Sequence, residues 1–209
     1  MNGNYLVYKK KMTGKYEDAI IHKSDLTIGM LGEKIMLRIR LADSSDYSNI
    51  RDFYYSLIEA MEEAEYKPGW KKDIYPAQEF LTRSIKNHEL YVGEIDERMV
   101  SAMVVNHEYN DGYKDVQWSV AAKDPELYVI HALGVDPVFS GQGIAKEMVH
   151  QVIKTARENH IKTIRLDVLE GNIPAEKAYT KMGFTYLDTI QMFYEDTGWT
   201  NYKVFEFVV

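Results

Sequence analysis

The chain has no cysteine among its 209 residues, which excludes disulfides, thiolate metal sites and a cysteine nucleophile. Its six histidines show none of the spacings used by zinc proteases, so the sequence predicts no metal site. It also lacks a run of about 20 apolar residues, which a membrane-spanning helix requires, and the continuous apolar block of a secretion signal. We therefore expect a cytoplasmic protein with no membrane partner.

Positive charge is scarce as well. The chain carries 25 Lys and Arg against 32 Asp and Glu, a formal net charge of −7, and it has no basic tail or stripe. Nucleic acid is therefore not an expected partner, because its phosphates are bound by clustered basic residues. The hydrophobic content is 45%, which is sufficient for a globular domain with a real core.

The first 35 residues form a weak pattern that differs from the rest of the chain. A possible strand at Tyr5–Tyr8 precedes the lysine run Lys9–Lys11, and three glycines interrupt the remainder of this segment: Gly14, Gly29 and Gly32. We predict a small hairpin extension over residues 1–35, of unassigned role, and then one domain over residues 36–209.

From Met36 onward, the apolar periodicity alternates between that of strands and that of helices. We expect a first helix capped by Asp43 or Ser44, a second with Pro76 in its first turn, and a long loop over residues 107–126. The fold class is therefore α/β (α+β), with a mixed central sheet of about seven strands, mostly antiparallel in its first half, and helices on both faces. The predicted strands cover residues 37–41, 90–95, 99–106, 127–135, 163–169, 186–194 and 199–208, and the later helices cover 143–160 and 174–182.

The most informative local feature is a glycine-containing turn between a buried strand and a helix. Leu127–Val135 is almost continuously apolar, as in a strand buried on both faces, and the turn at Ser140–Ala145 comes next. Such a turn presents unpaired amides at the positive end of the helix, and glycine allows close approach of a pyrophosphate. A plain glycine-rich turn is the alternative. The turn lacks the dinucleotide fingerprint and the P-loop Gly-Lys-Ser/Thr, which disfavours NAD-linked enzymes and kinases.

A second motif lies one helix and one strand later: Asn172-x-x-Ala175-x-x-x-Tyr179-x-x-x-Gly183-Phe184. The two motifs together resemble those of the GNAT superfamily of acyl-CoA-dependent N-acyltransferases. The first family motif, Gln/Arg-x-x-Gly-x-Gly/Ala, is matched by Ser140–Ala145 except at its first position, and the second is matched throughout. The resemblance extends roughly over residues 36–209 and implies the GNAT acyltransferase fold.

The resemblance also implies that acetyl-CoA, or coenzyme A, is the cofactor. Its pantetheine arm would pair with the splayed strand, and backbone amides would hold its pyrophosphate. Ser140 replaces the usual Gln or Arg, so its contact should be weaker. Asn172 would contact the cofactor arm, and its alternative role is that of a helix cap. Lys181 would reach a cofactor phosphate, and the alternative is a solvated lysine. The implied cofactor-binding residues are Leu133, Gly134, Val135, Ser140, Gly141, Gln142, Gly143, Ile144, Ala145, Asn172, Ala175, Tyr179 and Lys181.

For catalysis, the resemblance implies that Tyr179 protonates the departing thiolate, although Tyr179 could also be a core tyrosine. His131 is the first candidate for the base, on the same strand face as Leu133 and Val135 by alternation. A hydrogen-bonded core histidine is the alternative. Glu94 is the second candidate for the base. The alternative is that it is a surface residue beside a turn.

These features predict an N-acetyltransferase that moves an acetyl group to a primary amine, of a small molecule or a peptide, by direct attack in a ternary complex. A non-catalytic coenzyme A sensor or scaffold, a longer acyl donor and a protein amine acceptor remain alternatives. Trp70 and Tyr75 could line the acceptor pocket, and the aromatic closing hairpin suggests a possible homodimer. Four acidic residues could attract an amine or form a solvated face: Glu59, Glu62, Glu63 and Glu65.

Overall fold

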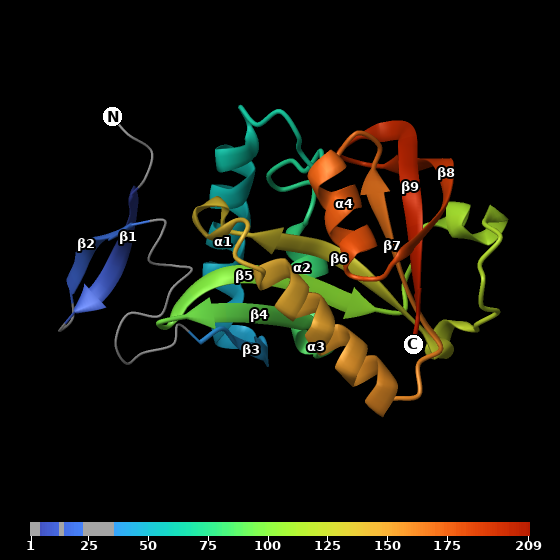
Figure 1. Cartoon of the computed structure of the whole chain (residues 1–209), viewed down its shortest axis with the longest axis horizontal. Coiled ribbons are helices and arrows are strands. Elements are labelled where there is room, and N and C mark those ends of the chain that lie inside the picture. The colour runs from blue at the N-terminus through green and yellow to red at the C-terminus, as the bar shows by residue number, and fades with distance from the viewer. Residues whose placement is uncertain (1–4, 13–14, 23–35) are drawn as a thin grey trace.

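The computed structural model describes residues 5–12, 15–22 and 36–209. Residues 36–209 contain a seven-stranded sheet of order β3-β4-β5-β6-β7-β9-β8 (Figure 1). Neighbouring strands are antiparallel except β6 and β7, which run parallel, so the predicted mixed sheet is confirmed. The strands are β3 (Arg38–Leu41), β4 (Leu90–Ile95), β5 (Arg98–Asn106), β6 (Leu127–Val135), β7 (Thr163–Leu169), β8 (Thr185–Tyr194) and β9 (Gly198–Val208).

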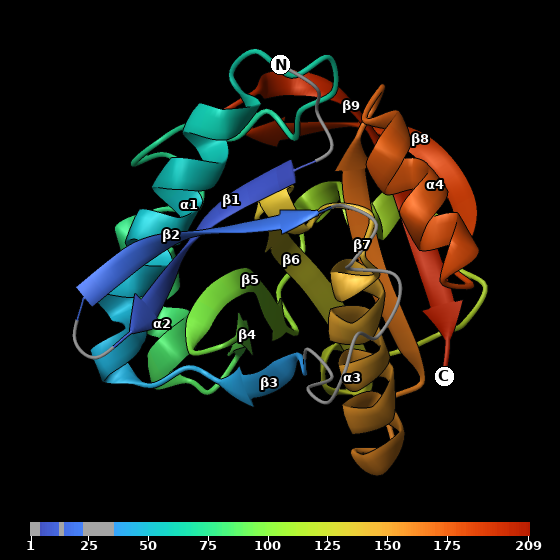
Figure 2. The same ribbon diagram turned by 60° about the vertical axis from the view of Figure 1, so that its left-hand side comes forward.

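Helices cover both faces of this sheet, as predicted (Figures 1 and 2). On one face lie α1 (Tyr47–Met61) and α2 (Gln78–Lys86), and on the other lie α3 (Ile144–Glu158) and α4 (Ile173–Lys181). Each long helix has an apolar stripe at helical spacing, and burying that stripe against the sheet is its main source of stability. The stripe of α3 is buried throughout and consists of Ile144, Met148, Val149, Val152, Ile153 and Ala156.

Two predicted helix starts differ from the structure. Pro76 lies outside α2, because Ala77 is the N-cap residue and the helix begins at Gln78. Asp43 does act as a cap, but its side chain accepts from the Ser45 amide at the start of a 3₁₀ turn, Ser44–Asp46, that precedes α1. The local apolar pattern therefore located the helices, whereas their first residues differ from those predicted.

The predicted loop over residues 107–126 contains two 3₁₀ turns, Asp111–Asp115 and Asp124–Glu126. Tyr113 and Val116 from this segment pack over β6, β7 and β9 on the face that also carries α1 and α2. The segment thus completes one layer of the core where no helix of residues 36–209 lies.

The N-terminal segment forms an antiparallel hairpin of β1 (Tyr5–Met12) and β2 (Lys15–His22), which confirms the predicted hairpin. The glycines predicted to interrupt it lie outside the described residues. Within the part of the chain that the structure describes, no helix is long and apolar enough to cross a membrane.

The feature that positions the site is the divergence of β6 from β7. The two strands pair only where Leu127–Val129 faces Thr163–Arg165, and the remainder of β6 pairs with β5 alone (Figure 2). Beyond Val129, therefore, the backbone groups of β6 that face β7 form no ladder to that strand. These groups lie in the middle of the sheet and face a cavity.

Candidate active site

A cavity of about 850 Å³ runs from the N-terminus of α3, through the opening between β6 and β7, to the opposite face of the sheet. Leu133, Gly134 and Val135 of β6 line it, next to residues from α3 and α4. A concave site of this size, at the diverging ends of two strands, is typical of a small-molecule or cofactor pocket.

At one end, the turn before α3 forms an open cradle of backbone amides. Gly141 and Gly143 have φ angles of +77° and +84°, and Gly143 is the N-cap of α3 without a side-chain hydrogen bond. A Cβ built on either glycine would meet no atom within 4 Å, so the space beside the backbone is free. The first amides of a helix have no partner within the helix and carry its positive end. The cradle therefore fits a diphosphate.

The other residues predicted for this turn divide into two groups. Ser140, Ile144 and Ala145 line the cavity. Gln142 does not, because its side-chain amide donates to the Val138 carbonyl at 3.3 Å. Only the backbone of Gln142 is available to a ligand.

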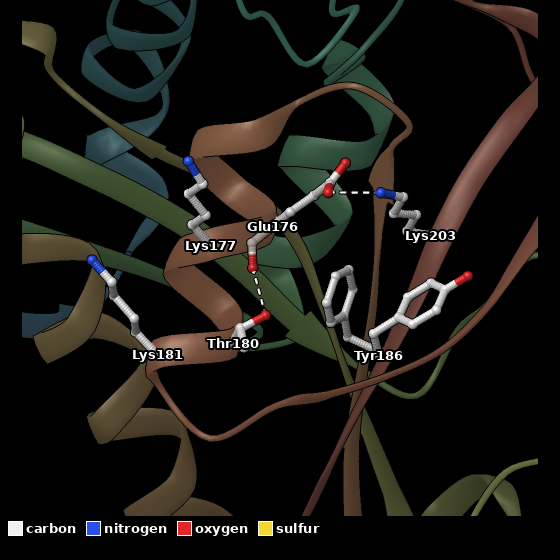
Figure 3. A pocket seen from close by; sticks show the side chains of 7 residues that line it. Glu176, Lys177, Thr180, Lys181, Tyr186 and Lys203 are labelled. Carbon is white, nitrogen blue, oxygen red and sulfur yellow. Dashed lines mark hydrogen bonds and ion pairs between the residues drawn. The ribbon is translucent and has the colours of Figure 1, made fainter.

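Positive side chains surround the mouth of the cavity near this cradle. Lys181, predicted from the sequence, lines it, and so do Lys146 and Lys177, which no sequence motif indicated. Figure 3 shows Lys177 and Lys181 extending to one side of α4, away from the ion pair of Glu176 and Lys203. The lysines complement an anionic ligand, although the overall charge of the chain is negative.

Asn172 is the N-cap residue of α4, but its side chain makes no capping hydrogen bond. Instead, Asn172 lines the cavity, as does Ala175 one turn later. The alternative role of Asn172 as a side-chain helix cap is therefore wrong, and the side-chain amide is available to a ligand.

Tyr179 lines the cavity from α4 and is half-buried. Its ring lies between those of Phe184 and Phe205, at centroid distances of 5.6 Å and 6.4 Å. Burial, and secondly the charge of Asp167, raises the pKa of the Tyr179 hydroxyl above its usual value. At neutral pH this hydroxyl is therefore protonated and can donate a proton or a hydrogen bond.

His131 lines the cavity on the face opposite to the one predicted. Ala132 has a φ of +51° and forms a β-bulge, which changes the alternation of β6. The ring of His131 consequently packs against Phe80 of α2, whereas Leu133 and Val135 pack on the α3 side. A bulge depends on strand pairing, so side-chain alternation along one strand did not reveal it.

The hydrogen bonds of His131 define its tautomer. Nε2 lies 2.9 Å from Oδ1 of Asn106 and 3.0 Å from the carbonyl of Glu108, and both are acceptors. The Asn106 oxygen is identified by the Glu108 amide, which donates to it at 3.0 Å. Nε2 therefore carries the hydrogen, and Nδ1 makes no hydrogen bond within residues 36–209. Burial lowers the pKa of His131 to about 4, so the ring is neutral at pH 7.

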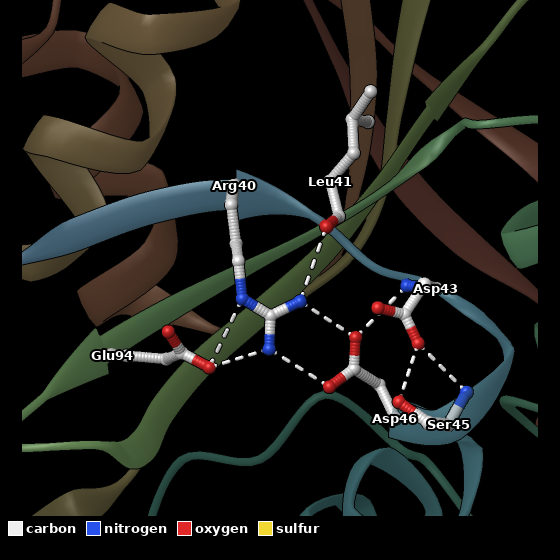
Figure 4. Close-up of polar contacts among 6 residues, drawn as sticks. All are labelled: Arg40, Leu41, Asp43, Ser45, Asp46 and Glu94. Atoms are coloured by element: carbon white, nitrogen blue, oxygen red, sulfur yellow. Dashed lines mark hydrogen bonds and ion pairs between the residues drawn. The ribbon is translucent and has the colours of Figure 1, made fainter.

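Glu94 does not line the cavity, and its role as a base stays a prediction that this position does not favour. Its carboxylate accepts from Nη2 and Nε of Arg40 at 2.6 Å and 3.2 Å, and the same guanidinium donates to both oxygens of Asp46 (Figure 4). This network connects β3, β4 and the turn before α1. An isolated strand-end carboxylate looks the same in sequence whether it is catalytic or paired.

The end of the cavity far from the lysines is acidic and aromatic. The predicted lining by Trp70 and Tyr75 is confirmed. The acidic residues predicted to attract an amine, Glu59, Glu62, Glu63 and Glu65, do not line the cavity, and Glu59 pairs with Lys72. Four further lining residues were missed: Asp167, Tyr194, Asp196 and Tyr202. For Asp167, the available signal was a carboxylate interrupting an otherwise largely apolar strand.

The sequence pattern of the acetyltransferase (GNAT) family matches residues 52–184. The chain is 26% identical over 93 residues to the [ribosomal protein bS18]-alanine N-acetyltransferase of Haemophilus ducreyi, covering 44% of this chain and 64% of that one, which is less than two thirds of the relative.

Two solved structures share the fold. A GNAT-family acetyltransferase from Streptococcus agalactiae 2603 has a TM-score of 0.69 at 18% identity, covering 83% of this chain and 95% of that one. Arabidopsis thaliana NAA60, in complex with acetyl-CoA, has a TM-score of 0.61 at 16% identity, covering 83% and 100%. With its two motifs placed on one cavity and the family pattern matched over most of its length, this chain belongs to the acetyltransferase (GNAT) family.

Proposed function

We propose that this protein transfers an acetyl group from acetyl-CoA to a primary amine by direct attack within a ternary complex. The observation that carries the proposal is the single cavity that joins the amide cradle of α3 to Tyr179 and then continues through the sheet. A donor held at the cradle and an acceptor entering from the opposite face would thus meet beside β6.

The cofactor-binding assignments rest on the chain's own groups. The amides from Gly141 to Ala145 would hold the diphosphate, with Lys146, Lys177 and Lys181 adding positive charge at the mouth. The backbone groups of Leu133–Val135 that face away from β5 form no ladder to β7, and they would bind the pantetheine amides as an added strand does. Bound acetyl-CoA supplies an activated acyl group as a thioester.

The transfer forms an amide C–N bond and breaks the thioester C–S bond. The amine loses one proton, and the departing sulfur gains one. Tyr179 is assigned as the donor to sulfur, because its buried hydroxyl is protonated at neutral pH. His131 retains Nδ1 as a proton acceptor, but a pKa of about 4 makes it a weak base. We infer that His131 chiefly positions the loop after β5, which it contacts through Asn106 and Glu108.

The second candidate function is that of a coenzyme A sensor without catalysis. The two functions make different predictions in one experiment. Calorimetry with coenzyme A should show 1:1 binding in either case. Thiol release from acetyl-CoA, measured with a panel of primary amines, should rise above the rate without amine only for the enzyme. Binding without amine-dependent thiol release across the panel would favour the sensor, and no binding would reject both.

A further inference from the structure

The cavity end that sequence motifs did not indicate has a distinct chemistry. We call it the acceptor chamber, and it is bounded by Trp70, Tyr75, Asp167, Tyr194, Asp196 and Tyr202. These residues come from the segment between α1 and α2, from β7, and from the end of the β8–β9 hairpin. None of them belongs to the two motifs that identify the family.

Asp196 is a buried carboxylate without a paired cation in the domain. It is 5% exposed, and it makes no ion pair or hydrogen bond with another side chain among residues 36–209. Only the amides of Asp196 and Thr197 bind it, and the exposed Lys71 acts on it from beyond salt-bridge distance. Burial raises its pKa. Burying a carboxylate without an opposite charge is costly even when amides bind it, so Asp196 is suited to a positively charged ligand.

Asp167 adds a second carboxylate to the same chamber. Its Oδ2 accepts from the hydroxyls of Tyr113 and Tyr194 at 2.8 Å and 3.0 Å, whereas Oδ1 has no hydrogen-bond partner in residues 36–209. Burial is the main cause that raises its pKa, and the charge of Asp196 adds to it. The chamber therefore holds two carboxylates, and a cation bound between them would stabilise the charged form of both.

Aromatic rings form the remaining walls. Trp70 and Tyr75 meet edge to face at 6.1 Å, and Tyr194 and Tyr202 do so at 4.9 Å. Ring faces attract ammonium groups and exclude water, which strengthens the attraction between a cation and a carboxylate.

The chamber is also covered where the segment between α1 and α2 meets the β8–β9 turn. Gly69 lies so close to the hairpin turn that a Cβ on it would be 2.6 Å from Cγ2 of Thr197 and 3.2 Å from Leu169. Figures 1 and 2 both place the segment between α1 and α2 beside the β8–β9 turn. This contact closes the chamber on that side and favours a small occupant.

We propose that the acceptor is a small aliphatic diamine or polyamine, whose distal ammonium binds between Asp167 and Asp196 while its other end, as a neutral amine, reaches the acetyl group. This inference rests on the proposed function and names its substrate class. A two-point contact of this kind would select diamines over monoamines of equal length.

The test compares Asp196→Asn with Asp188→Asn, which removes the same charge from an exposed position on β8 outside the cavity. The substrates are 1,4-diaminobutane, spermidine, the matched monoamine n-pentylamine and a short peptide with a free N-terminus. Asp196→Asn should lower kcat/KM for the two polyamines about 10- to 100-fold, the loss typical of a hydrogen bond to a charged group. It should change the value for pentylamine less than threefold and leave coenzyme A affinity unchanged, and Asp188→Asn should change none of these.

Equal losses for diamine and monoamine would overturn the proposal, and so would a peptide that is used better than either polyamine. Spermidine binding, measured by calorimetry without cofactor, separates this proposal from the proposed function. If spermidine binds, Asp196→Asn abolishes that binding and no thiol is released, the result would support the acceptor chamber and contradict the acetyltransferase function. Thiol release with pentylamine or the peptide, without spermidine binding, would support the transferase and reject the chamber.

Discussion

At the scale of single residues, the two carboxylates Glu94 and Asp196 show how environment decides role. Glu94 is neutralised by Arg40, which stabilises the contact between β3 and β4. Asp196 is more deeply buried but has no such partner in residues 36–209. In both cases the sequence shows an acidic residue near the end of a strand, with further acidic residues beside it. The difference arises from side chains far away in the chain, which local patterns do not report.

Glu94→Gln therefore tests whether this carboxylate is structural rather than catalytic. We expect kcat to be unchanged within twofold, because Glu94 does not reach the cavity, and the free energy of unfolding to fall by about 1 kcal/mol through loss of a charged hydrogen bond. Urea unfolding and thiol-release kinetics measure the two quantities. A hundredfold fall in kcat with intact coenzyme A binding would restore Glu94 as the base.

His131 predicts a pH effect on stability. Its folded pKa of about 4 lies below the ordinary value of 6.5, so the unfolded chain binds more protons. The contribution of neutral His131 to the free energy of unfolding is fully present above pH 6.5 and is lost as the pH falls towards 4. Integrated over that shift, the loss is up to about 3 kcal/mol.

Urea unfolding at pH 7 and pH 4 should show that His131→Gln loses less stability than the natural protein over this range. Groups elsewhere titrate equally in both proteins and cancel in the difference. Parallel losses would show that His131 is not held neutral by burial.

At the scale of elements, the central feature is the strand β6. It separates from β7 after Val129 and leads through a glycine-containing turn into α3. The strand β6, the helix α3 and the motif on α4 were predictable from apolar periodicity and glycine placement, and their bounds were predicted within a few residues. The bulge at Ala132 was not predictable, since it depends on the register between β5 and β6. Because of it, one strand presents His131 to α2 and Leu133 to α3.

Gly143→Ala tests the amide cradle. The φ of +84° makes a side chain there cost about 1–2 kcal/mol in stability, and the added methyl group would enter the space assigned to the diphosphate. We expect coenzyme A affinity to fall at least tenfold, measured by calorimetry. Gly198→Ala is the matched control: its φ is +69°, its Cβ would also meet nothing within 4 Å, and it does not line the cavity.

Gly198→Ala should thus lose similar stability and bind coenzyme A normally. If both variants bound coenzyme A with the affinity of the natural protein, the cradle would not be its phosphate site.

At the scale of the whole molecule, the cavity has lysines at one end, which we assign to the cofactor, and two carboxylates at the other, which we assign to the acceptor, within a chain of net charge −7. Composition alone gives no position for either group of charges. The segment from Pro68 to Tyr75 and the β8–β9 turn are distant in sequence, and only the folded chain brings them together. Because of that long-range contact, no sequence motif revealed Asp167, Tyr194, Asp196 and Tyr202, although Trp70 and Tyr75 were predicted to line this side.

The homodimer remains a prediction. Of the aromatic residues in the closing hairpin, Phe193 and Trp199 are 49% and 69% exposed and lie against each other at 5.8 Å. Light scattering at micromolar concentration should give twice the chain mass of 24.3 kDa, and Trp199→Glu should shift it to the monomer mass. A monomer in the natural protein would contradict this prediction.

The most direct test of the central claim is the pair of measurements on Tyr179→Phe. The Tyr179 hydroxyl is assigned to the departing sulfur, and the amide cradle is assigned to the diphosphate. We therefore predict that turnover, measured by thiol release, falls about 10²- to 10⁴-fold, while the Kd for coenzyme A changes less than threefold. Turnover equal to that of the natural protein would contradict the claim.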